Sequence, residues 1–207
     1  DRSGAIITLM SQDYAELLKK LRSSEIDENL ITLLNQLGKE HKDPLTGLLD
    51  YRSFSFKMQD RLPKTTRFSL IAMSIDHLQE LNLLSGWVVG DLAITSFAGL
   101  LETLPAAGDF SGRLSGSTFM VFTESIDIRT IKSWLADLAE RLATVKLPGV
   151  DLFPEGHLTF SAGVFRTMGS KDSSEECVIE AQKRLQCAKA QGGGRISLLA
   201  GSGTGLE

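Results

Sequence analysis

This sequence offers little support for disulfides, a membrane-spanning helix or a secretory leader. It has two cysteines among 207 residues, and no run of about 18 apolar residues of the kind that crosses a membrane. No signal-peptide pattern begins the chain, so we expect a soluble, cytoplasmic protein. Cys177 and Cys187 lie on one predicted helix, where ten residues rise about 15 Å, beyond the roughly 7 Å Cα separation of a disulfide. Both are expected to be free thiols, as in a reducing compartment.

A surplus of basic residues is also missing. The 22 lysines and arginines are outnumbered by 26 aspartates and glutamates, for a net charge of −4. Binding along a nucleic-acid backbone requires a basic surface, so DNA and RNA are excluded as main partners. A hydrophobic content of 42% is enough for one good core, and the length indicates a single domain with a modest extension.

The two ends of the chain differ from its middle. Residues 1–42 are interpreted as a helical linker, because apolar residues recur at helical spacing from Tyr14 to Leu37. Short helices are marginal alone, so this apolar face requires a neighbour, which is the following domain, a second copy or an upstream module. The chain begins with Asp1 instead of Met and is expected to be part of a longer protein. Residues 201–207 are interpreted as a tail with a vector-derived end.

Residues 43–200 have a mixed pattern of helices and strands. Helices are predicted at 50–62, at 127–146 and at 173–191. Two more are predicted on either side of Gly86: a short one with Leu78 and Leu81 inward, and a second with one apolar stripe of Val89, Leu92, Phe97, Leu100, Leu101 and Leu104. Strands are predicted at 68–75, in a hairpin over 113–122, at 158–165 and at 195–200. Strands that arrive as a hairpin, with helices between the others, indicate an α+β fold. We expect a central, mainly antiparallel sheet of five strands flanked by helices.

Four segments carry a family resemblance. They are DPLTGL (43–48) with Phe54, SIDHLQELN (74–82) running into GWVVGD (86–91), RLSGSTF (113–119), and SAGV (161–164) with CAKAQGGGR (187–195). In this order and spacing they resemble the GGDEF (diguanylate cyclase-like) family. The resemblance implies a nucleotidyl-cyclase-like fold in which two domains, each holding one GTP, meet face to face and make cyclic di-GMP with the help of metal ions.

The positions that bind metal in that family are replaced here. The resemblance places the two metal-binding carboxylates at Ser74 and Ser117, and a further acidic residue of the signature at Thr118. Mg²⁺ prefers hard, charged oxygen ligands, so two serines are poor substitutes. The phosphate-facing lysine of the family corresponds to Gln79, and an arginine to Gly193. We therefore expect no catalytic residue, no metal site and no Mg²⁺-dependent cofactor binding in a degenerate GGDEF domain.

The nucleotide-binding positions are better preserved. The resemblance implies that Asn82 and Asp91 read guanine and that Lys189 contacts phosphate. A carboxylate accepts from guanine N1–H and N2–H₂, and an amide donates to N7 or O6. The simpler interpretations remain open: Asn82 as a polar residue at a helix end, and Asp91 as a carboxylate near a helix N-terminus.

Three further residues are weaker candidates. Asp109 is a remnant of the family's inhibitory RxxD motif, whose arginine corresponds to Ala106; its simpler interpretation is a solvated loop residue. Asp76 either binds a cation or is a capping or solvated carboxylate. Trp87 replaces the family's histidine, and packing is preferred over a cover for the pocket.

The sequence therefore predicts a catalytically inactive GGDEF-like signalling domain, a regulatory or interaction module in cyclic di-GMP-type bacterial signalling. Its expected partners are another protein domain, a second copy through the N-terminal helices, and GTP or another guanine nucleotide. Two alternatives stay open. One is a divergent active cyclase or nucleotide hydrolase that recruits metal through Asp76. The other is a ligand-free dimerisation module.

Overall fold

The computed structural model describes residues 40–65, 67–104, 108–168 and 173–198. The chain divides into two compact units, residues 1–39 and residues 40–207. The predicted helical linker at residues 1–42 lies outside the described residues, except for residues 40–42. The predicted tail at 201–207 also lies outside them.

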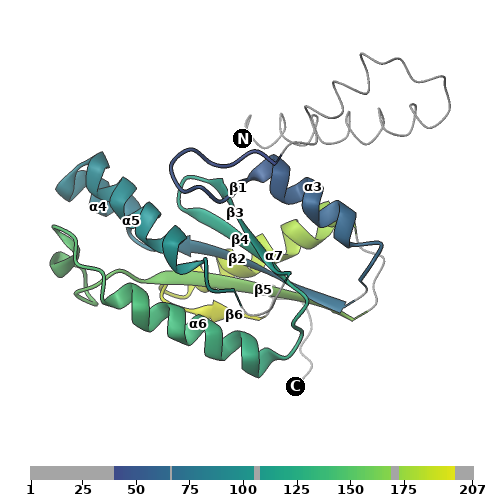
Figure 1. Cartoon of the computed structure of the whole chain (residues 1–207). Helices are drawn as coiled ribbons and strands as arrows, with labels where there is room; N and C mark the ends of the chain where they lie inside the picture. The colour runs from purple at the N-terminus through teal and green to yellow at the C-terminus, as the bar shows by residue number, and fades with distance from the viewer. Residues whose placement is uncertain (1–39, 66, 105–107, 169–172, 199–207) are drawn as a thin grey trace, which may run out of the picture. The chain divides into compact units, whose positions relative to one another are not determined.

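A six-stranded sheet is the centre of the second unit (Figure 1). Its strands are β1 (Leu49–Asp50), β2 (Arg67–Ile75), β3 (Phe110–Ser115), β4 (Thr118–Thr123), β5 (Phe160–Met168) and β6 (Ile196–Ser197). The order is β1-β3-β4-β2-β5-β6, with antiparallel pairing in the middle and a parallel pair at each edge. The α+β fold is confirmed. The expected number of five strands is wrong, because two-residue β1 is too short to produce an alternating pattern.

The helices follow the predicted order along the chain. They are α3 (Tyr51–Arg61), α4 (Leu78–Ser85), α5 (Trp87–Leu100), α6 (Ile128–Ala143) and α7 (Ser174–Ala190), with a short 3₁₀ turn at Val150–Leu152. The start of α7 is set by a capping box, in which Ser173 Oγ accepts from the Glu176 amide and the Glu176 carboxylate accepts from the Ser173 amide. Cys177 and Cys187 both lie on α7, and neither is in a disulfide.

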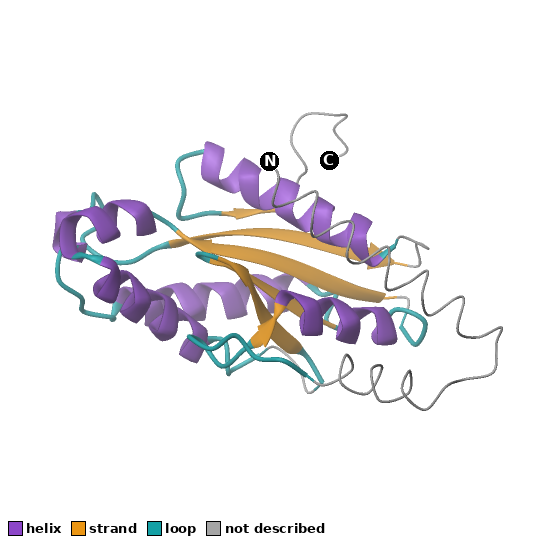
Figure 2. Cartoon of the chain, turned by 90° about the horizontal axis from the view of Figure 1, so that it is seen from above, coloured by secondary structure: helices purple, strands orange, loops and turns teal. Residues whose placement is uncertain are grey.

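Helices cover both faces of the sheet, as the view from above shows (Figure 2). Helices α4, α5 and α6 contribute to one apolar core, and α3 and α7 contribute to the other. Strand β2 supplies both, with Ile71 and Met73 in the first core and Leu70 and Ala72 in the second. A strand buried on both faces has a continuous apolar sequence, which explains the run FSLIAMSI at residues 68–75.

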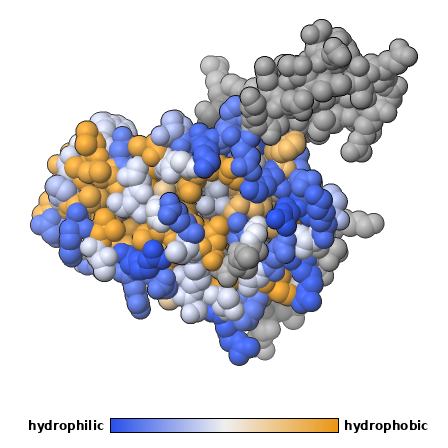
Figure 3. All heavy atoms as spheres, viewed as in Figure 1, coloured by the Kyte–Doolittle hydropathy of each residue, from blue (hydrophilic) through white to orange (hydrophobic). Residues whose placement is uncertain are grey.

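Two side chains expected to pack are instead exposed. Leu92 was predicted on the buried stripe of α5 but is 48% exposed, and Trp87 is 77% exposed. They belong to a group that we call the α4–α5 apolar patch: Leu83, Leu84, Trp87, Val88 and Leu92. Figure 3 shows hydrophobic residues gathered at the end of the molecule formed by α4 and α5. A cluster of large exposed apolar side chains is a common mark of an interaction surface.

Candidate functional site

Three polar side chains from distant parts of the sequence meet at the end of β2. Ser74, near the end of β2, pairs with Thr118 at the start of β4, and Ser117 lies in the turn between β3 and β4. The hydroxyl oxygens of Ser74 and Ser117 are 2.9 Å apart. Lys189, in the last turn of α7, donates from Nζ to Ser74 Oγ over 2.7 Å. We call these three residues the hydroxyl–ammonium cluster.

The positive charge of this cluster has no carboxylate beside it. Ser74 is fully buried, and Ser117 and Lys189 are half-buried. Within the described part of the chain, none of the ion pairs formed within 4.0 Å includes Lys189. A lysine ammonium has three N–H donors, and here Ser74 takes one of them. The cluster therefore presents a cation with donors to spare.

The carboxylate of Asp76 is nearly buried and accepts three hydrogen bonds. It is 7% exposed, and its Oδ1 accepts from Ser161 Oγ at 2.8 Å. Its Oδ2 accepts from Thr159 Oγ1 at 3.2 Å and from the Gly194 amide at 2.8 Å. The carboxylate thereby ties the end of β2 to the start of β5 and to the loop after α7. Its environment is structural, which weakens the hypothesis that it recruits a metal.

A chain of hydrogen bonds holds the hairpin that carries Ser117. Asp43 Oδ1 accepts from both the amide and the hydroxyl of Thr46, at 2.9 and 2.7 Å. The same carboxylate accepts from Arg113 Nη1 at 3.0 and 3.2 Å, and Arg113 Nε donates to the Gly116 carbonyl at 2.9 Å. Gly116 has a positive φ of 49°, a conformation that suits glycine in a tight turn. The segment DPLTGL thus positions the hairpin turn.

The pKa of Asp43 is lowered from its ordinary value of 3.8. Burial acts to raise it, but hydrogen bonds from Thr46 and Arg113 and the Arg113 charge together prevail. A carboxylate with a lowered folded-state pKa stabilises the fold above its unfolded pKa. That stabilisation is lost as the pH falls below 3.8 and through the folded pKa.

Replacing Asp43 should measure this contribution. We expect Asp43→Asn to lower the free energy of unfolding at pH 7 by about 2 kcal/mol, because a charged hydrogen bond to the mostly buried Arg113 is lost. The matched control is Asp60→Asn, whose pair with Lys64 is exposed and should change stability by less than about 0.5 kcal/mol. Urea unfolding at pH 7 and at pH 3 is the measurement. Equal losses in the two variants, or an undiminished acid sensitivity in Asp43→Asn, would contradict this role.

The predicted guanine-binding residues lie at the corner between α4 and α5. Asn82 packs against Gly90: a Cβ atom added to Gly90 would lie 2.9 Å from Asn82 Cγ and closer still to Oδ1. Asn82 Oδ1 is buried without a hydrogen-bond partner among the described residues, whereas Asn82 as a whole is half-buried. The Nδ2 group is thus the outward-facing end of the amide. Asp91, the residue after Gly90, is exposed.

Asp109 lies apart from the cluster. It is half-buried at the start of β3, and its Oδ1 accepts from the Glu124 amide at 3.2 Å. This hydrogen bond connects the residue before β3 to the residue after β4. The corresponding Ala106 falls outside the described residues.

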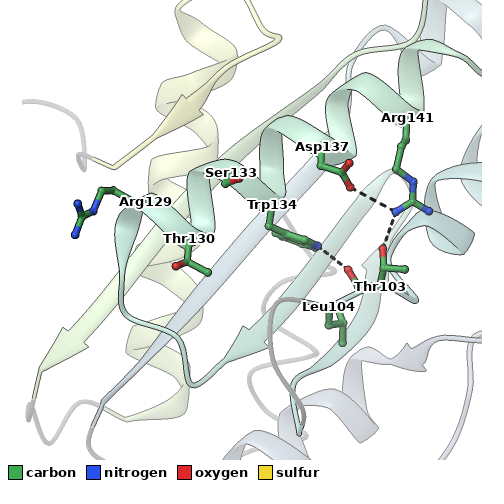
Figure 4. A pocket seen from close by; sticks show the side chains of 8 residues that line it. All are labelled: Thr103, Leu104, Arg129, Thr130, Ser133, Trp134, Asp137 and Arg141. Atoms are coloured by element: carbon green, nitrogen blue, oxygen red, sulfur yellow. Dashed lines mark hydrogen bonds and ion pairs between the residues drawn. The ribbon is translucent and has the colours of Figure 1, made fainter.

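A shallow pocket beside α6 is lined by none of the residues that the sequence predicted for the site (Figure 4). Four of its lining residues interact with one another. Trp134 Nε1 donates to the Thr103 carbonyl at 2.6 Å, and Arg141 Nη1 donates to Thr103 Oγ1 at 2.7 Å. Asp137 lies 3.7 Å from the same Arg141 group.

The comparison with known families decides the identity of this fold. Residues 40–195 match the family model described as "Diguanylate cyclase, GGDEF domain". This chain belongs to the GGDEF family. Residues 115–119, Ser-Gly-Ser-Thr-Phe, form the turn of the β3–β4 hairpin and lie within the matched range.

Two relatives of this chain are named as diguanylate cyclases. The chain is 26% identical over 190 residues to the diguanylate cyclase DgcP of Pseudomonas aeruginosa, covering 88% of this chain and 28% of DgcP. It is 29% identical over 172 residues to the diguanylate cyclase VdcA of Vibrio cholerae, covering 79% of this chain and 50% of VdcA. This GGDEF domain therefore spans half or less of the length of these relatives.

Solved structures share the fold. The GGDEF domain of DgcB from Caulobacter crescentus, in complex with c-di-GMP, superposes with a TM-score of 0.68 at 19% identity, covering 77% of this chain and 95% of that one. The diguanylate cyclase SiaD of Pseudomonas aeruginosa, in complex with its activator SiaC, gives a TM-score of 0.67 at 18% identity, covering 94% and 71%.

The resemblance assigns metal binding to Ser74 and Ser117, and the surroundings of these two residues bear on whether they fit a metal ion. Within the described ranges, no group of three or more His, Cys, Asp or Glu side chains could hold a metal ion. At Ser74 and Ser117 the ligands would be two neutral hydroxyls with an ammonium 2.7 Å from one of them. Mg²⁺ is usually held through one or two carboxylates and would be repelled by the ammonium, so these residues do not fit Mg²⁺.

The structure also locates features that sequence reasoning missed. The contact between Lys189 and Ser74 joins residues 115 positions apart, and no local pattern indicates it. Thr159 and Ser161, which saturate Asp76, were not singled out, although Ser161 opens the SAGV segment. Over the described residues, no helix is long and apolar enough to pass through a bilayer.

Proposed function

We propose that this GGDEF domain is a catalytically inactive regulatory module in cyclic di-GMP signalling. The observation that carries the proposal is the hydroxyl–ammonium cluster at Ser74 and Ser117, where the resemblance implies metal-binding carboxylates. Phosphoryl transfer to a sugar hydroxyl depends on cations that neutralise the triphosphate and on carboxylates that hold them. Hydroxyls cannot replace that charge. The saturated Asp76 supports the same proposal against a divergent cyclase or hydrolase.

The ligand in this proposal is GTP or another guanine nucleotide. The outward-facing Nδ2 of Asn82 can donate to guanine N7 or O6, and the exposed Asp91 carboxylate can accept from N1–H and N2–H₂. The buried, unpaired Oδ1 of Asn82 adds support, because unsatisfied buried polar atoms are rare outside sites with a role. Lys189, in the last turn of α7, can donate hydrogen bonds to the nucleotide phosphates.

The partner in this proposal is another protein domain. The α4–α5 apolar patch supports it, because large exposed apolar side chains are costly to leave in water. The greater length of DgcP and VdcA supports a setting among other domains. A second copy, paired through residues 1–42, is the other candidate partner. The net charge of −4 disfavours nucleic acid, and a cytoplasmic location suits the nucleotide ligand.

Two measurements test the proposal. Incubation with GTP and Mg²⁺ or Mn²⁺, followed by chromatography of the products, should give neither cyclic di-GMP nor a hydrolysis product above background. Thermal unfolding with GTP, GDP and cyclic di-GMP should show stabilisation by a guanine nucleotide, since any ligand of the native state raises its stability. Substantial turnover would refute the inactive domain, and the absence of any thermal shift at millimolar ligand would favour a ligand-free dimerisation module.

The contact between Gly90 and Asn82 offers a sharper test of guanine binding. In Gly90→Ala the new methyl group would displace the Asn82 side chain, so we expect the affinity for GTP to fall about tenfold, the value of one lost hydrogen bond. The matched control is Gly99→Ala on the same helix, where nothing lies within 4 Å of the added atom. Calorimetric titration measures both. An unchanged affinity in Gly90→Ala would remove Asn82 from the site.

A further inference from the structure

We propose that Lys189 takes the place of the missing divalent ion, so that this domain binds the phosphates of a guanine nucleotide without metal and Mg²⁺ weakens the binding. The inference rests on the proposed function, in which guanine is held near Asn82 and Asp91. It adds that the hydroxyl–ammonium cluster selects the nucleotide without its usual metal ion.

The hydrogen bonds of the cluster leave donors for an anion. Lys189 Nζ donates to Ser74 Oγ at 2.7 Å, which uses one of its three N–H groups. The hydroxyls of Ser74 and Ser117 share a hydrogen bond of 2.9 Å in which either can be the donor, and Ser74 Oγ also donates to the Ile75 carbonyl at 3.4 Å. Ser117 is half-buried whereas Ser74 is fully buried, so Ser117 carries the hydroxyl that a ligand can reach.

The charge of the cluster also requires an anion. Among described residues, none of the carboxylates comes within 4.0 Å of Lys189 Nζ, and Asp76 is committed to Ser161, Thr159 and Gly194. A half-buried ammonium is poorly hydrated, and an incoming phosphate restores the missing charge and hydrogen bonds. Two unused N–H donors of Lys189 and the hydroxyl of Ser117 would contact the phosphate oxygens.

The expected effect of Mg²⁺ is opposite in sign to that in a metal-dependent cyclase. Mg²⁺ neutralises part of the nucleotide charge and occupies the phosphate oxygens that the cluster would bind. It also brings a dication next to an ammonium, which is unfavourable in a partly buried site. The end of β2 leads directly into α4, so this phosphate site and the Asn82 corner lie in one continuous stretch of chain from Ser74 to Asn82.

Calorimetric titration of the whole chain with GDP and with guanosine, each in EDTA and in excess Mg²⁺, tests the inference. We expect GDP to bind the wild-type protein more tightly in EDTA than in Mg²⁺, and more tightly than guanosine. Lys189→Met should lower the GDP affinity in EDTA about tenfold or more, as expected for loss of a charged hydrogen bond, and leave guanosine unchanged. Ser117→Ala should have a smaller effect of the same kind. The control Lys183→Met, also on α7 and paired with Glu180, should leave all affinities unchanged.

The outcomes separate this inference from the proposed function. The inference is overturned if GDP binding requires Mg²⁺. It is also overturned if Lys189→Met and Lys183→Met change the affinity for GDP equally. Equal affinities for guanosine and GDP overturn it as well but leave the guanine site at Asn82 and Asp91 intact. Failure of both ligands to bind would remove the nucleotide from the proposed function too. Thermal unfolding of Lys189→Met verifies that the variant is folded, and Ser117→Ala carries the test if it is not.

Discussion

Supplied with GTP and Mg²⁺, this domain is expected to form cyclic di-GMP about 10³ to 10⁴ times more slowly than a relative that keeps its metal-binding carboxylates. The expectation follows from Ser74 and Ser117, which are neutral and already hydrogen-bonded to each other. Losing about 5 kcal/mol of metal stabilisation in the transition state is sufficient for a change of this size. The ammonium of Lys189 beside Ser74 opposes the entry of a divalent ion and adds to the loss.

The assay has two controls. The diguanylate cyclase VdcA of Vibrio cholerae, 29% identical over 172 residues, serves as the reference enzyme under the same conditions. The double variant Ser74→Asp, Ser117→Asp restores two carboxylates, so it should show Mg²⁺-dependent thermal stabilisation in the presence of GTP, whereas the wild-type protein should not. Product formation by the wild-type domain within tenfold of VdcA would contradict the role given to these positions.

Gly163→Ala is expected to destabilise the domain by about 3 kcal/mol, close to the upper limit for overpacking a core. Gly163 lies on β5, and a Cβ atom there would lie 2.5 Å from the Ala181 carbonyl oxygen and 2.6 Å from the Arg184 carbonyl carbon of α7. These are backbone atoms of a long helix, so the helix as a whole must move away from the sheet. At about 2 to 4 °C per kcal/mol for a domain of this size, Tm should fall by about 6 to 12 °C.

The matched control is again Gly99→Ala, at an exposed position of α5 with open space around the added atom. It should stabilise the domain by about 0.5 to 1 kcal/mol, because alanine is the better helix former. Urea unfolding of both variants gives the comparison. A Gly163→Ala protein as stable as the wild type would mean that α7 does not pack against β5 as closely as described here. The same close approach gives a physical reason for glycine in the SAGV segment.

Local patterns predicted the secondary structure well where the cause is local. The Ser173 and Glu176 capping box and the Gly116 turn of the β3–β4 hairpin each depend on residues within a few positions. The buried strand at 68–75 was equally clear, since a strand covered on both faces is apolar throughout. Strand β1 was missed because two residues are too few to show the alternating apolar pattern of a strand. Leu92 was placed inside because helical spacing alone does not say which stripe a helix buries.

The amino-acid sequence by itself determined that residues 74 and 117, to which the family resemblance assigns metal-binding carboxylates, are serines, because the identity of a side chain needs no coordinates. Only the tertiary structure decided what surrounds them. The order of strands brings α7 and its Lys189 to Ser74, and it brings Thr159, Ser161 and Gly194 to Asp76. Contacts between residues 80 to 120 positions apart depend on how the sheet is assembled, and hydrophobic periodicity carries no record of that assembly.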